Sequence, residues 1–465
     1  MKPTYQELET ELSQTKSLLK EAFEMIAALQ KEVRELKEQL NKNSKNSSKP
    51  PSSDQKANTP NEPKKPRKSR KGYNRPLFPK ERVDKTIECC VEHCPCCGST
   101  TLDSSKTIDV LHQVELPEVR AIVTEYILKK SRCNSCNHTS YGQLPLGIPY
   151  SAFGSKLMGL IGTLTGAFHI AKREAIQLIK DLYDIDIGLG SIPNIEERIS
   201  HALDPVYQMI HEFVLESDFS KHFDETVWRN SGKRHYVWLA SCNHAAVYMI
   251  DRCRNTQAFQ KLIKNKDLKN KLSVSDRYSL YKRLGDRHQY CLAHLIRDFR
   301  KFGEREGPDK PIGRSIEQAL SKACSIHKKY REGKINLTQR NRRLGHVRKR
   351  AEWWFYEGLA NGSDELSGLC NRLLNEFEKL WTFSKETELE PTNNLAERDL
   401  RKLVIWRKKS YGTRSDNGQR FVERITSVIQ TLRKKKKNAL KFIQEALTAF
   451  YKKEKPPQIC SEMGF

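Results

Sequence analysis

Apolar residues recur every seven positions along the first forty residues, and Glu and Lys fill most of the places between them. One seam of the repeat contains Leu12, Leu19, Ile26, Val33 and Leu40, and the second contains Leu8, Thr15, Ala22, Leu29 and Leu36. β-Branched residues in one seam and leucines in the other favour a parallel coiled coil of two chains. We therefore predict a coiled coil over residues 1–42 that makes the protein a homodimer. The alternative is a single amphipathic helix packed on the rest of the chain.

Helical periodicity returns between residues 150 and 215. Apolar positions spaced three and four apart predict helices at 153–164, 170–182 and 195–210, with a Gly-rich turn at 188–193 before the third. We interpret 150–215 as a helical DNA-binding region. Both a helix-turn-helix and a plain helical bundle fit this spacing.

Aromatic and β-branched residues gather in short runs after residue 216. HYVWLA at 235–240 and AAVYMI at 245–250 are separated by SCNH, which predicts a β-hairpin. A further short strand is expected at 272–275, directly before Asp276, and an earlier strand is expected to end at Asp224. Two carboxylates thus lie at the ends of predicted strands.

The remainder of the chain has helical spacing. Residues 313–385 are charged and helical, with Trp353, Trp354 and Trp381 expected as buried anchors. Later helices are predicted at 393–404, 420–432 and 439–451. The run Lys434–Lys437 is expected to be a solvated helix end.

The chain of 465 residues is strongly basic, with 83 Lys and Arg against 57 Asp and Glu and a net charge of +26. A surface of this charge attracts polyanions, and nucleic acid is the first candidate. The longest apolar stretch, residues 157–168, is too short to span a membrane and is broken by Gly and Thr, so no membrane partner is expected. No secretory signal is visible at the N-terminus, so the 13 cysteines are better interpreted as thiols and metal ligands than as disulfides.

Two Cys-x2-Cys pairs predict a zinc-binding ribbon over residues 86–140. The ligands are expected to be Cys94, Cys97, Cys133 and Cys136, because two such pairs supply four thiolates to a tetrahedral, structural Zn²⁺. Strands are expected between the pairs at 108–114 and 120–127. Nearby residues leave the identity of the first pair open; these are Cys89, Cys90, His93 and Cys96. Free thiols are the alternative to a metal site.

Residues 43–85 form a predicted disordered, basic linker, rich in Asn, Ser, Lys and Pro. Lys64–Lys80 contains eight basic residues and no acidic ones. Arg67 and Lys68 in this run are candidates for contacts with DNA phosphates, since each cation can release a condensed counterion. A solvated charge run is the alternative.

Asp224, Asp276 and Glu397 are candidate ligands for a pair of magnesium ions. Phosphoryl transfer on DNA commonly uses two Mg²⁺ ions, which prefer carboxylate and water oxygens. Spacing alone does not distinguish this trio from other combinations among 57 acidic residues.

Several motifs together resemble those of the IS66 family of insertion-sequence transposases, which are DDE-type enzymes. The similar segments are the linker at 43–54, the cysteine pairs, Asp224–Thr226 with Trp228, QYCLAHLIRDF at 289–299, and NNLAER at 393–398. The family's corresponding motifs are C-x-A-H-x-x-R-x-F and N-N-x-x-E-R around the catalytic Glu. Thr392 is a departure, because the family usually has Asp there.

The resemblance implies an α/β catalytic domain of RNase H-like type over residues 216–432, with a mixed five-stranded sheet and flanking helices. An all-α insertion is then expected at about 305–388, and a C-terminal helix and tail at 433–465. Asp224 and Asp276 would lie on adjacent strands, with Glu397 on a helix beside them, as catalytic ligands of Mg²⁺ or Mn²⁺. His294 is expected near this site, in an assisting or a structural role.

The resemblance also implies a function and partners. The protein is expected to bind the terminal inverted repeats of its element and to catalyse metal-dependent strand cleavage and transfer into target DNA. Arg407, Lys408, Lys409 and Arg414 are candidate phosphate contacts near Glu397. Accessory proteins of the same element and a cytoplasmic, nucleoid-associated location in a bacterium are further expectations. The alternatives are a non-catalytic DNA-binding relative, acting through the zinc ribbon and the coil, and a metal-dependent nuclease without strand transfer.

Overall fold

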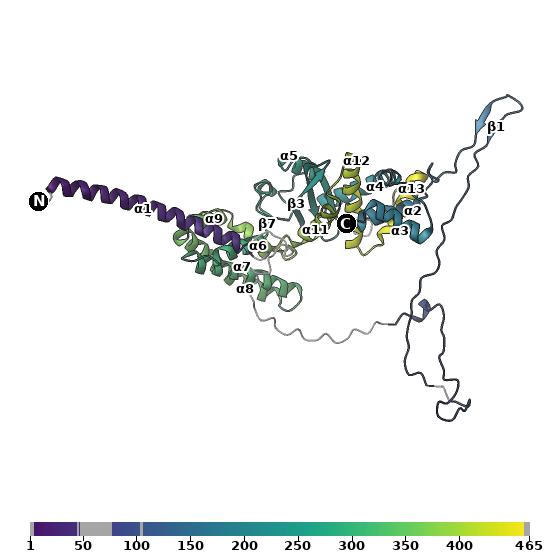
Figure 1. The fold of residues 1–465 in the computed structure, drawn as a ribbon, viewed down its shortest axis with the longest axis horizontal. Helices are drawn as coiled ribbons and strands as arrows, with labels where there is room; N and C mark the ends of the chain where they lie inside the picture. The colour runs from purple at the N-terminus through teal and green to yellow at the C-terminus, as the bar shows by residue number, and fades with distance from the viewer. Residues whose placement is uncertain (1–3, 44–45, 47–76, 103–105, 460–465) are drawn as a thin grey trace. The chain divides into compact units, whose positions relative to one another are not determined.

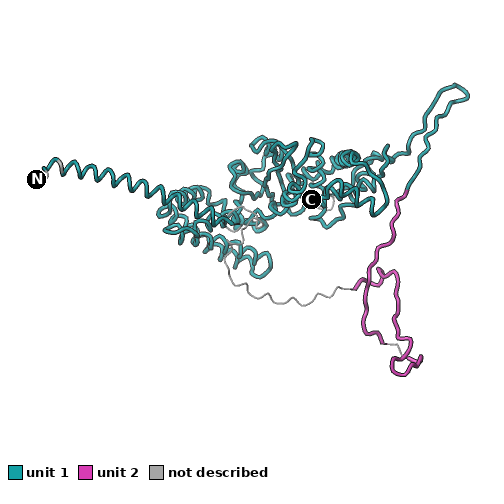
Figure 2. Tube along the Cα trace, viewed as in Figure 1, with its two compact units in different colours: residues 1–59, 123–465 teal, residues 60–122 magenta. Residues whose placement is uncertain are grey.

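The computed structural model describes residues 4–43, 46, 77–102 and 106–459 (Figure 1). Within them the chain divides into two units, one of Met1–Thr59 with Val123–Phe465 and one of Pro60–Ile122 (Figure 2). Arg67 and Lys68, like most of the predicted linker, lie outside the described residues. The smaller unit contains the 3-10 helix η3 (Lys80–Arg82).

The strands expected at 108–114 and 120–127 are absent, so that prediction was wrong. Ile108 and Ile122 are each 94% exposed. A β-branched run gains little from pairing when no second layer covers its apolar face, which explains the irregular chain. The short antiparallel strands β1 (Lys130–Arg132) and β2 (Thr139–Tyr141) lie instead on either side of the second cysteine pair.

Helix α1 (Tyr5–Leu40) carries the heptad repeat along one continuous helix. The described apolar residues of both seams are at the surface of this single chain, from Leu8 at 49% to Leu40 at 71% exposed. Burying such a seam requires a partner, so the two-chain coiled coil stays a prediction. Near its C-terminal end, Glu38 pairs with Lys301 and Arg305 at 2.8 and 2.6 Å.

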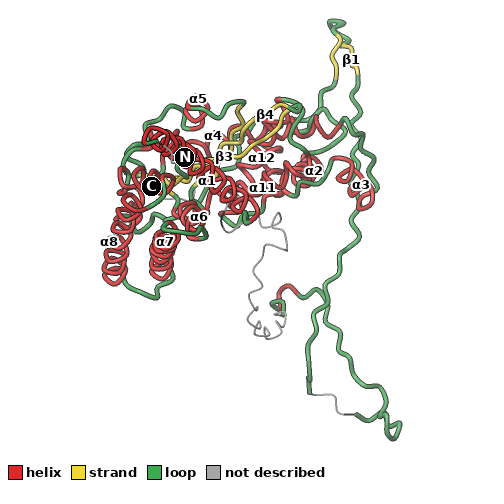
Figure 3. Tube along the Cα trace, turned by 60° about the vertical axis from the view of Figure 1, so that its left-hand side comes forward, coloured by secondary structure: helices red, strands yellow, loops and turns green. Residues whose placement is uncertain are grey.

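A mixed five-stranded sheet forms the centre of the larger unit, as expected (Figure 3). Its strands in spatial order are β5 (Ala246–Asp251), β4 (Lys233–Ser241), β3 (Lys221–Asn230), β6 (Ser273–Ser275) and β7 (His288–Tyr290). The predicted hairpin is confirmed as β4 and β5, and β3 pairs antiparallel with β4. Strands β6 and β7 run parallel to β3. The sequence pattern missed β7, because three residues are too few to show alternation.

Helices cover both faces of this sheet. Helix α11 (Asn394–Ser410) packs on β3 and β4. On the other face, Phe223 of β3 contacts Phe259 of α5 (Thr256–Leu262) and Tyr281 of η4 (Ser279–Leu284), with ring centroids 5.4 and 6.3 Å apart. Because side chains alternate along a strand, Asp224 faces the α11 side and Glu225 the η4 side.

The edge strand β5 is covered by α12 (Asp416–Lys434). The amides of Ala246, Tyr248 and Ile250 donate to side-chain oxygens of α12 at 3.2, 3.0 and 2.5 Å. The acceptors are Thr431, Ser427 and Glu423, spaced one helical turn apart. An edge whose amides are satisfied in this way offers no template for another strand.

The helices predicted between 150 and 215 are present as α2 (Ser155–Ala167), α3 (Lys172–Tyr183) and α4 (Ser191–Glu216). Their buried residues belong to the same hydrophobic core as the sheet and α12. Helix α13 (Ala439–Lys452) packs against α2 and α4. This segment therefore shares its core with the sheet.

A second hydrophobic core joins the helices between β7 and α11 to Val274 of β6 and Tyr290 of β7. Its elements are α6 (Leu292–Gly303), α7 (Asp309–Arg331), α8 (Leu337–Asn361), α9 (Asp364–Asn375), η5 (Phe377–Leu380) and α10 (Thr382–Lys385). Figure 3 shows α6, α7 and α8 side by side. Trp381 is fully buried there, whereas Trp353 is 54% exposed, so the expected anchoring role of Trp353 was wrong. Within the described residues, no helix is long and apolar enough to cross a membrane.

Lys434 also differs from its expected solvated position. Its ammonium lies 2.8 Å from the carboxylate of Asp399, and both side chains are less than a tenth exposed. The reason is that α12 ends against β4, where Lys434 also donates to the carbonyl of Cys242 at 2.7 Å. An amphipathic pattern cannot reveal such a buried ion pair.

Candidate active site and cysteine knuckles

The parallel pairing of β3 and β6 brings Asp224 and Asp276 together. Lys221 pairs with Ser273 and His222 with Val274, so Asp224 and Asp276 occupy equivalent positions two residues further along. Asp224 accepts a hydrogen bond from the amide of Glu225 at 2.9 Å. Asp276 accepts one from the amide of Tyr278, also at 2.9 Å. Asp224 thus lies on β3, whereas Asp276 lies one residue past the end of the adjacent strand β6.

Glu397 lies in the first turn of α11, near enough to Asp224 for its charge to raise the pKa of that carboxyl. The start of this helix is fixed by Asn393, whose side chain donates to the carbonyl of Phe223 at 2.7 Å and contacts Nδ1 of His222 at 3.1 Å. The backbone amide of Asn393 donates to Sγ of Cys291 at 3.1 Å. Sequence reasoning had included Asn393 in a motif without a role. The structure makes it the residue that ties α11 to β3 and to the start of α6.

Burial raises the pKa of Asp224 well above its usual range, and the neighbouring carboxylates of Glu225, Asp276 and Glu397 raise it further. Among the described residues, neither Asp224 nor Asp276 forms an ion pair with Lys or Arg. Uncompensated carboxylates in a chain of net charge +26 are an unusual arrangement. Their oxygen donors fit a hard cation such as Mg²⁺ or Mn²⁺.

Glu225 has other partners and is separated from this group. Arg254 donates to Oε1 of Glu225 at 2.8 and 2.5 Å, and the hydroxyl of Tyr281 donates to Oε2. Burial raises the pKa of Glu225, while these hydrogen bonds oppose the rise. The two neighbouring carboxylates of β3 therefore differ in their counterions. Glu225 is paired with Arg254, whereas Asp224 has no Lys or Arg partner among the described residues.

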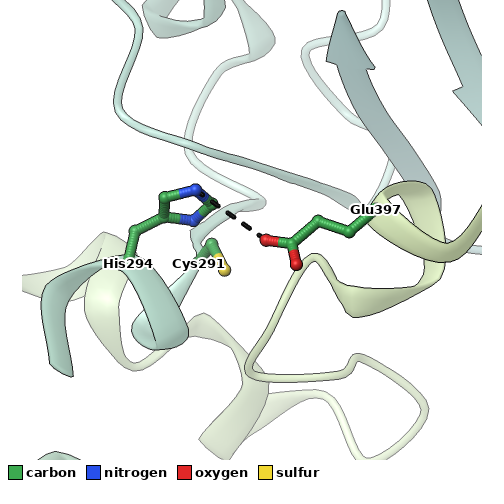
Figure 4. Close-up of side chains that lie close together, drawn as sticks. All are labelled: Cys291, His294 and Glu397. Atoms are coloured by element: carbon green, nitrogen blue, oxygen red, sulfur yellow. Dashed lines mark ion pairs between the residues drawn. The ribbon is translucent and has the colours of Figure 1, made fainter. Parts of the chain in front are cut away.

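Cys291, His294 and Glu397 form a compact cluster at the start of α6 and α11 (Figure 4). Nε2 of His294 lies 3.8 Å from Oε1 of Glu397, and Nη2 of Arg297 lies 3.9 Å from the same oxygen. Burial lowers the pKa of His294, and the charge of Arg297 lowers it further. Burial raises the pKa of Cys291 to about 11, against the effect of the amide of Asn393. The sequence resemblance included Cys291 and Arg297 but assigned neither a role.

Asp399 fixes the middle of α11 against the sheet and α12. Its carboxylate accepts from Ser241 at 2.6 Å and from Gln430 at 2.7 Å, in addition to the ion pair with Lys434. The hydroxyl of Tyr248 donates to its backbone carbonyl at 3.1 Å. Asp399 is two residues from Glu397, so this network holds the helix that presents Glu397. Sequence reasoning missed it because nothing local marks Asp399 as buried.

The basic candidates at the end of α11 differ in their environments. The guanidinium of Arg407 donates to the carbonyl of Val227, and burial lowers its pKa. Lys408, Lys409 and Arg414 are exposed. Eleven residues of helix separate Glu397 from Lys408, about 16 Å along the axis. The exposed cations therefore lie at the opposite end of α11 from Glu397.

The two cysteine pairs form knuckles of the same local design. In the first, the amide of Gly98 donates to the carbonyl of Cys94 at 2.9 Å, and Gly98 has a φ of 71°. In the second, the amide of Asn137 donates to the carbonyl of Cys133 at 2.9 Å, with a φ of 59°.

Backbone amides are directed at a sulfur in each knuckle. Those of Cys97 and Cys96 lower the pKa of Cys94, and those of Cys136 and Ser135 lower the pKa of Cys133. Amides that stabilise a thiolate favour metal binding. The alternative ligands Cys89, Cys90 and Cys96 are exposed, as is His93.

Carboxylates without counterions beside a mixed sheet, in a basic chain with two Cys-x2-Cys knuckles, are typical of proteins that process nucleic acid. The family model described as the transposase IS66 family matches residues 151–420, and that of the zinc-finger binding domain of transposase IS66 matches residues 92–137. The chain belongs to the IS66 family of transposases. Residues 1–77 match a family of unknown function. No curated protein matches the chain.

Membership of this family supports a role as a transposase. The zinc-finger domain supports the binding of structural zinc and of DNA.

Proposed function

We propose that the protein is an active DDE-type transposase, which binds the terminal inverted repeats of its element and catalyses strand cleavage and strand transfer. In this proposal the sheet with α11 is an RNase H-like catalytic core over 216–432, and the helices at about 305–388 are an insertion. The observation that supports the proposal is that Asp224 and Asp276 follow paired positions of β3 and β6 without an ion pair to Lys or Arg, and that the charge of Glu397 acts on Asp224. Holding these carboxylates ionised and close together costs free energy unless a cation neutralises their charge.

Asp224, Asp276 and Glu397 are the proposed ligands of Mg²⁺ or Mn²⁺. The metal ions, when bound, supply an activated oxygen nucleophile and stabilise the leaving oxygen of the cleaved strand. The protein contributes position: paired strands hold the two aspartates, and Asn393 fixes the helix that presents Glu397. Arg297, near Glu397, is placed to attract a phosphate of the DNA backbone.

DNA binding is assigned to parts of the chain with exposed cations. Cys94, Cys97, Cys133 and Cys136 are the proposed ligands of a structural Zn²⁺ that shapes a DNA-binding ribbon. Lys408, Lys409 and Arg414 are proposed to contact phosphates, together with Arg67 and Lys68. The exposed seam of α1 is proposed to pair two chains, so that both ends of the element are held in one complex.

The test uses a labelled DNA carrying the inverted repeats that flank the gene, incubated with full-length protein and Mg²⁺ or Mn²⁺. We expect cleavage at the repeat tips by the wild type and none by Asp276→Asn. Asp286→Asn is a matched control, because Asp286 is exposed and lies ten residues away. It should cleave like the wild type.

The products separate the alternatives. Joined products establish strand transfer, whereas cleavage without joining indicates a nuclease and contradicts the transposase proposal. Equal cleavage by the wild type and by Asp276→Asn would show that the three carboxylates are not needed for the reaction. Binding of the repeats without cleavage, with every metal ion and with the element's accessory proteins added, favours the non-catalytic relative.

A further inference from the structure

Two helix N-termini bring sulfur, imidazole and carboxylate donors to one point beside the proposed acidic trio. One ligand atom each from Cys291, His294 and Glu397 lies within 4.8 Å of the other two (Figure 4). Cys291 is the N-cap of α6 and His294 lies three residues later, so both project from the same face. Glu397 comes from the first turn of α11. Both helices are packed in hydrophobic cores, so the cluster is rigidly supported.

Two atoms of this cluster lack hydrogen-bond partners. Nδ1 of His294 and Oε1 of Glu397 are buried, and neither has a partner among the residues that the structure describes. The 3.8 Å between Nε2 of His294 and Oε1 of Glu397 exceeds a hydrogen bond. In a tetrahedral zinc site with ligand bonds of about 2.1 Å, two ligand atoms lie about 3.4 Å apart. The spacing is therefore too wide for a direct hydrogen bond and close to that around a metal ion.

The third donor is Cys291, whose sulfur is buried and accepts from the amide of Asn393 at 3.1 Å. The amide favours the thiolate, but burial outweighs it and raises the pKa of Cys291 to about 11, so a bound metal has to displace the thiol proton. Arg297 is the competing cation, 3.9 Å from Oε1 of Glu397. It makes no hydrogen bond at that distance, and its side chain is 26% exposed, so it has room to turn toward solvent.

We propose that Cys291, His294 and Glu397 bind a thiophilic divalent cation of the Zn²⁺ class, and that this ion withdraws Glu397 from the acidic trio. Sulfur and imidazole prefer Zn²⁺, whereas Mg²⁺ prefers an all-oxygen set. On binding, the S–H bond of Cys291 breaks, a sulfur–metal bond forms, and the proton passes to solvent. Zn²⁺ is then an inhibitor of the DNA reaction. This last consequence rests on the proposed function, whereas the binding itself does not.

Binding is tested by equilibrium dialysis of the full-length protein against Zn²⁺, with the bound metal counted by atomic emission. The wild type is expected to hold one more equivalent than either Cys291→Ser or His294→Ala, since all three proteins keep the knuckle cysteines. Cys242→Ser is the control, because Cys242 is also buried but belongs to no metal-ligand cluster of the described residues. It should bind as much Zn²⁺ as the wild type.

His294→Ala decides the result if Cys291→Ser unfolds, because the His294 side chain is 31% exposed and its loss leaves the core intact. Equal zinc content in the wild type and His294→Ala overturns the site.

The inhibitory consequence is tested in the cleavage assay with fixed Mg²⁺. Added Zn²⁺ should reduce wild-type cleavage at least tenfold, and Cys291→Ser should require at least tenfold more Zn²⁺ for the same inhibition. If the wild type binds the extra equivalent of Zn²⁺ but its DNA cleavage is not inhibited, the ion does not draw Glu397 away from the two aspartates. A wild type that never cleaves DNA refutes the proposed function, while the zinc count still decides the site.

Discussion

Replacing Asp399 by Ala tests whether one buried ion pair holds the helix that carries Glu397. The carboxylate accepts from Ser241, Gln430 and Lys434 at 2.6, 2.7 and 2.8 Å. Its side chain is 5% exposed and that of Lys434 is 8% exposed. Asp399→Ala leaves the Lys434 ammonium buried without its counterion, and removing one partner of a buried pair costs about 3–5 kcal/mol.

The assay is urea unfolding followed by tryptophan fluorescence, because Trp228, Trp238 and Trp406 lie in the core that contains α11. Asp399→Ala should lower the free energy of unfolding by about 3–5 kcal/mol. Lys434→Met should also cost about 3–5 kcal/mol, because it leaves the Asp399 carboxylate buried without its counterion. The double variant should cost at least about 1 kcal/mol less than the sum, since it leaves no isolated buried charge.

A matched control uses the exposed pair of Lys441 and Glu445, whose charged atoms are 3.9 Å apart. Glu445→Ala should change the stability by less than about 0.5 kcal/mol. The reasoning is refuted if Asp399→Ala costs less than about 1 kcal/mol, or if the two single changes add without coupling.

Three further predictions concern packing and titration. Burial raises the pKa of Glu423 from 4.5 to about 7, so the stability that its protonated form contributes at acidic pH is lost as the pH rises through this range. Glu423→Gln should therefore be about 3 kcal/mol more stable than the wild type above this range and equally stable below it. Melting temperatures measured across pH test this difference. A Cβ at Gly313 would lie 2.6–2.8 Å from backbone atoms of α6, so Gly313→Ala should lower the free energy of unfolding by about 1–3 kcal/mol. Gly345→Ala is the control, because a Cβ there would have no atom within 4 Å, and it should be neutral or slightly stabilising. Trp381→Ala should cost about 3–5 kcal/mol by urea unfolding because the ring is fully buried, and an equal cost for the exposed Trp353→Ala would contradict this assignment.

Much of the secondary structure follows from local patterns. The hairpin of β4 and β5 was predictable because its two runs are rich in aromatic and β-branched residues and are joined by a short turn. The helices of 150–215 and α11–α13 were predictable from apolar spacing. The strands expected at 108–114 and 120–127 show the limit of this approach, because a β-branched run forms a strand only where neighbours bury it.

The candidate site was predictable only in part. The resemblance singled out Asp224, Asp276 and Glu397; the pairing of β3 with β6 brings the two aspartates close, and Glu397 acts on Asp224 through its charge. Their catalytic role stays a prediction, as do the DNA contacts of Lys408, Lys409 and Arg414. Lys408 and Lys409 lie at the far end of α11 from Glu397, because this helix continues to Ser410, beyond the end predicted at residue 404.

Local information in the chain is sufficient for the heptads of α1, the two cysteine knuckles and most helices, because these depend on residues within a few turns of one another. Long-range packing alone determines the pairing of Asp224 with Asp276 across β3 and β6, the anchoring of α11 by Asn393, and the burial of Lys434 against Asp399. The physical reason is that the energy of a charged side chain is set by its surroundings and not by its residue type alone. The pKa of such a group, its partner and the free energy of burying it depend on which distant segments exclude water from it.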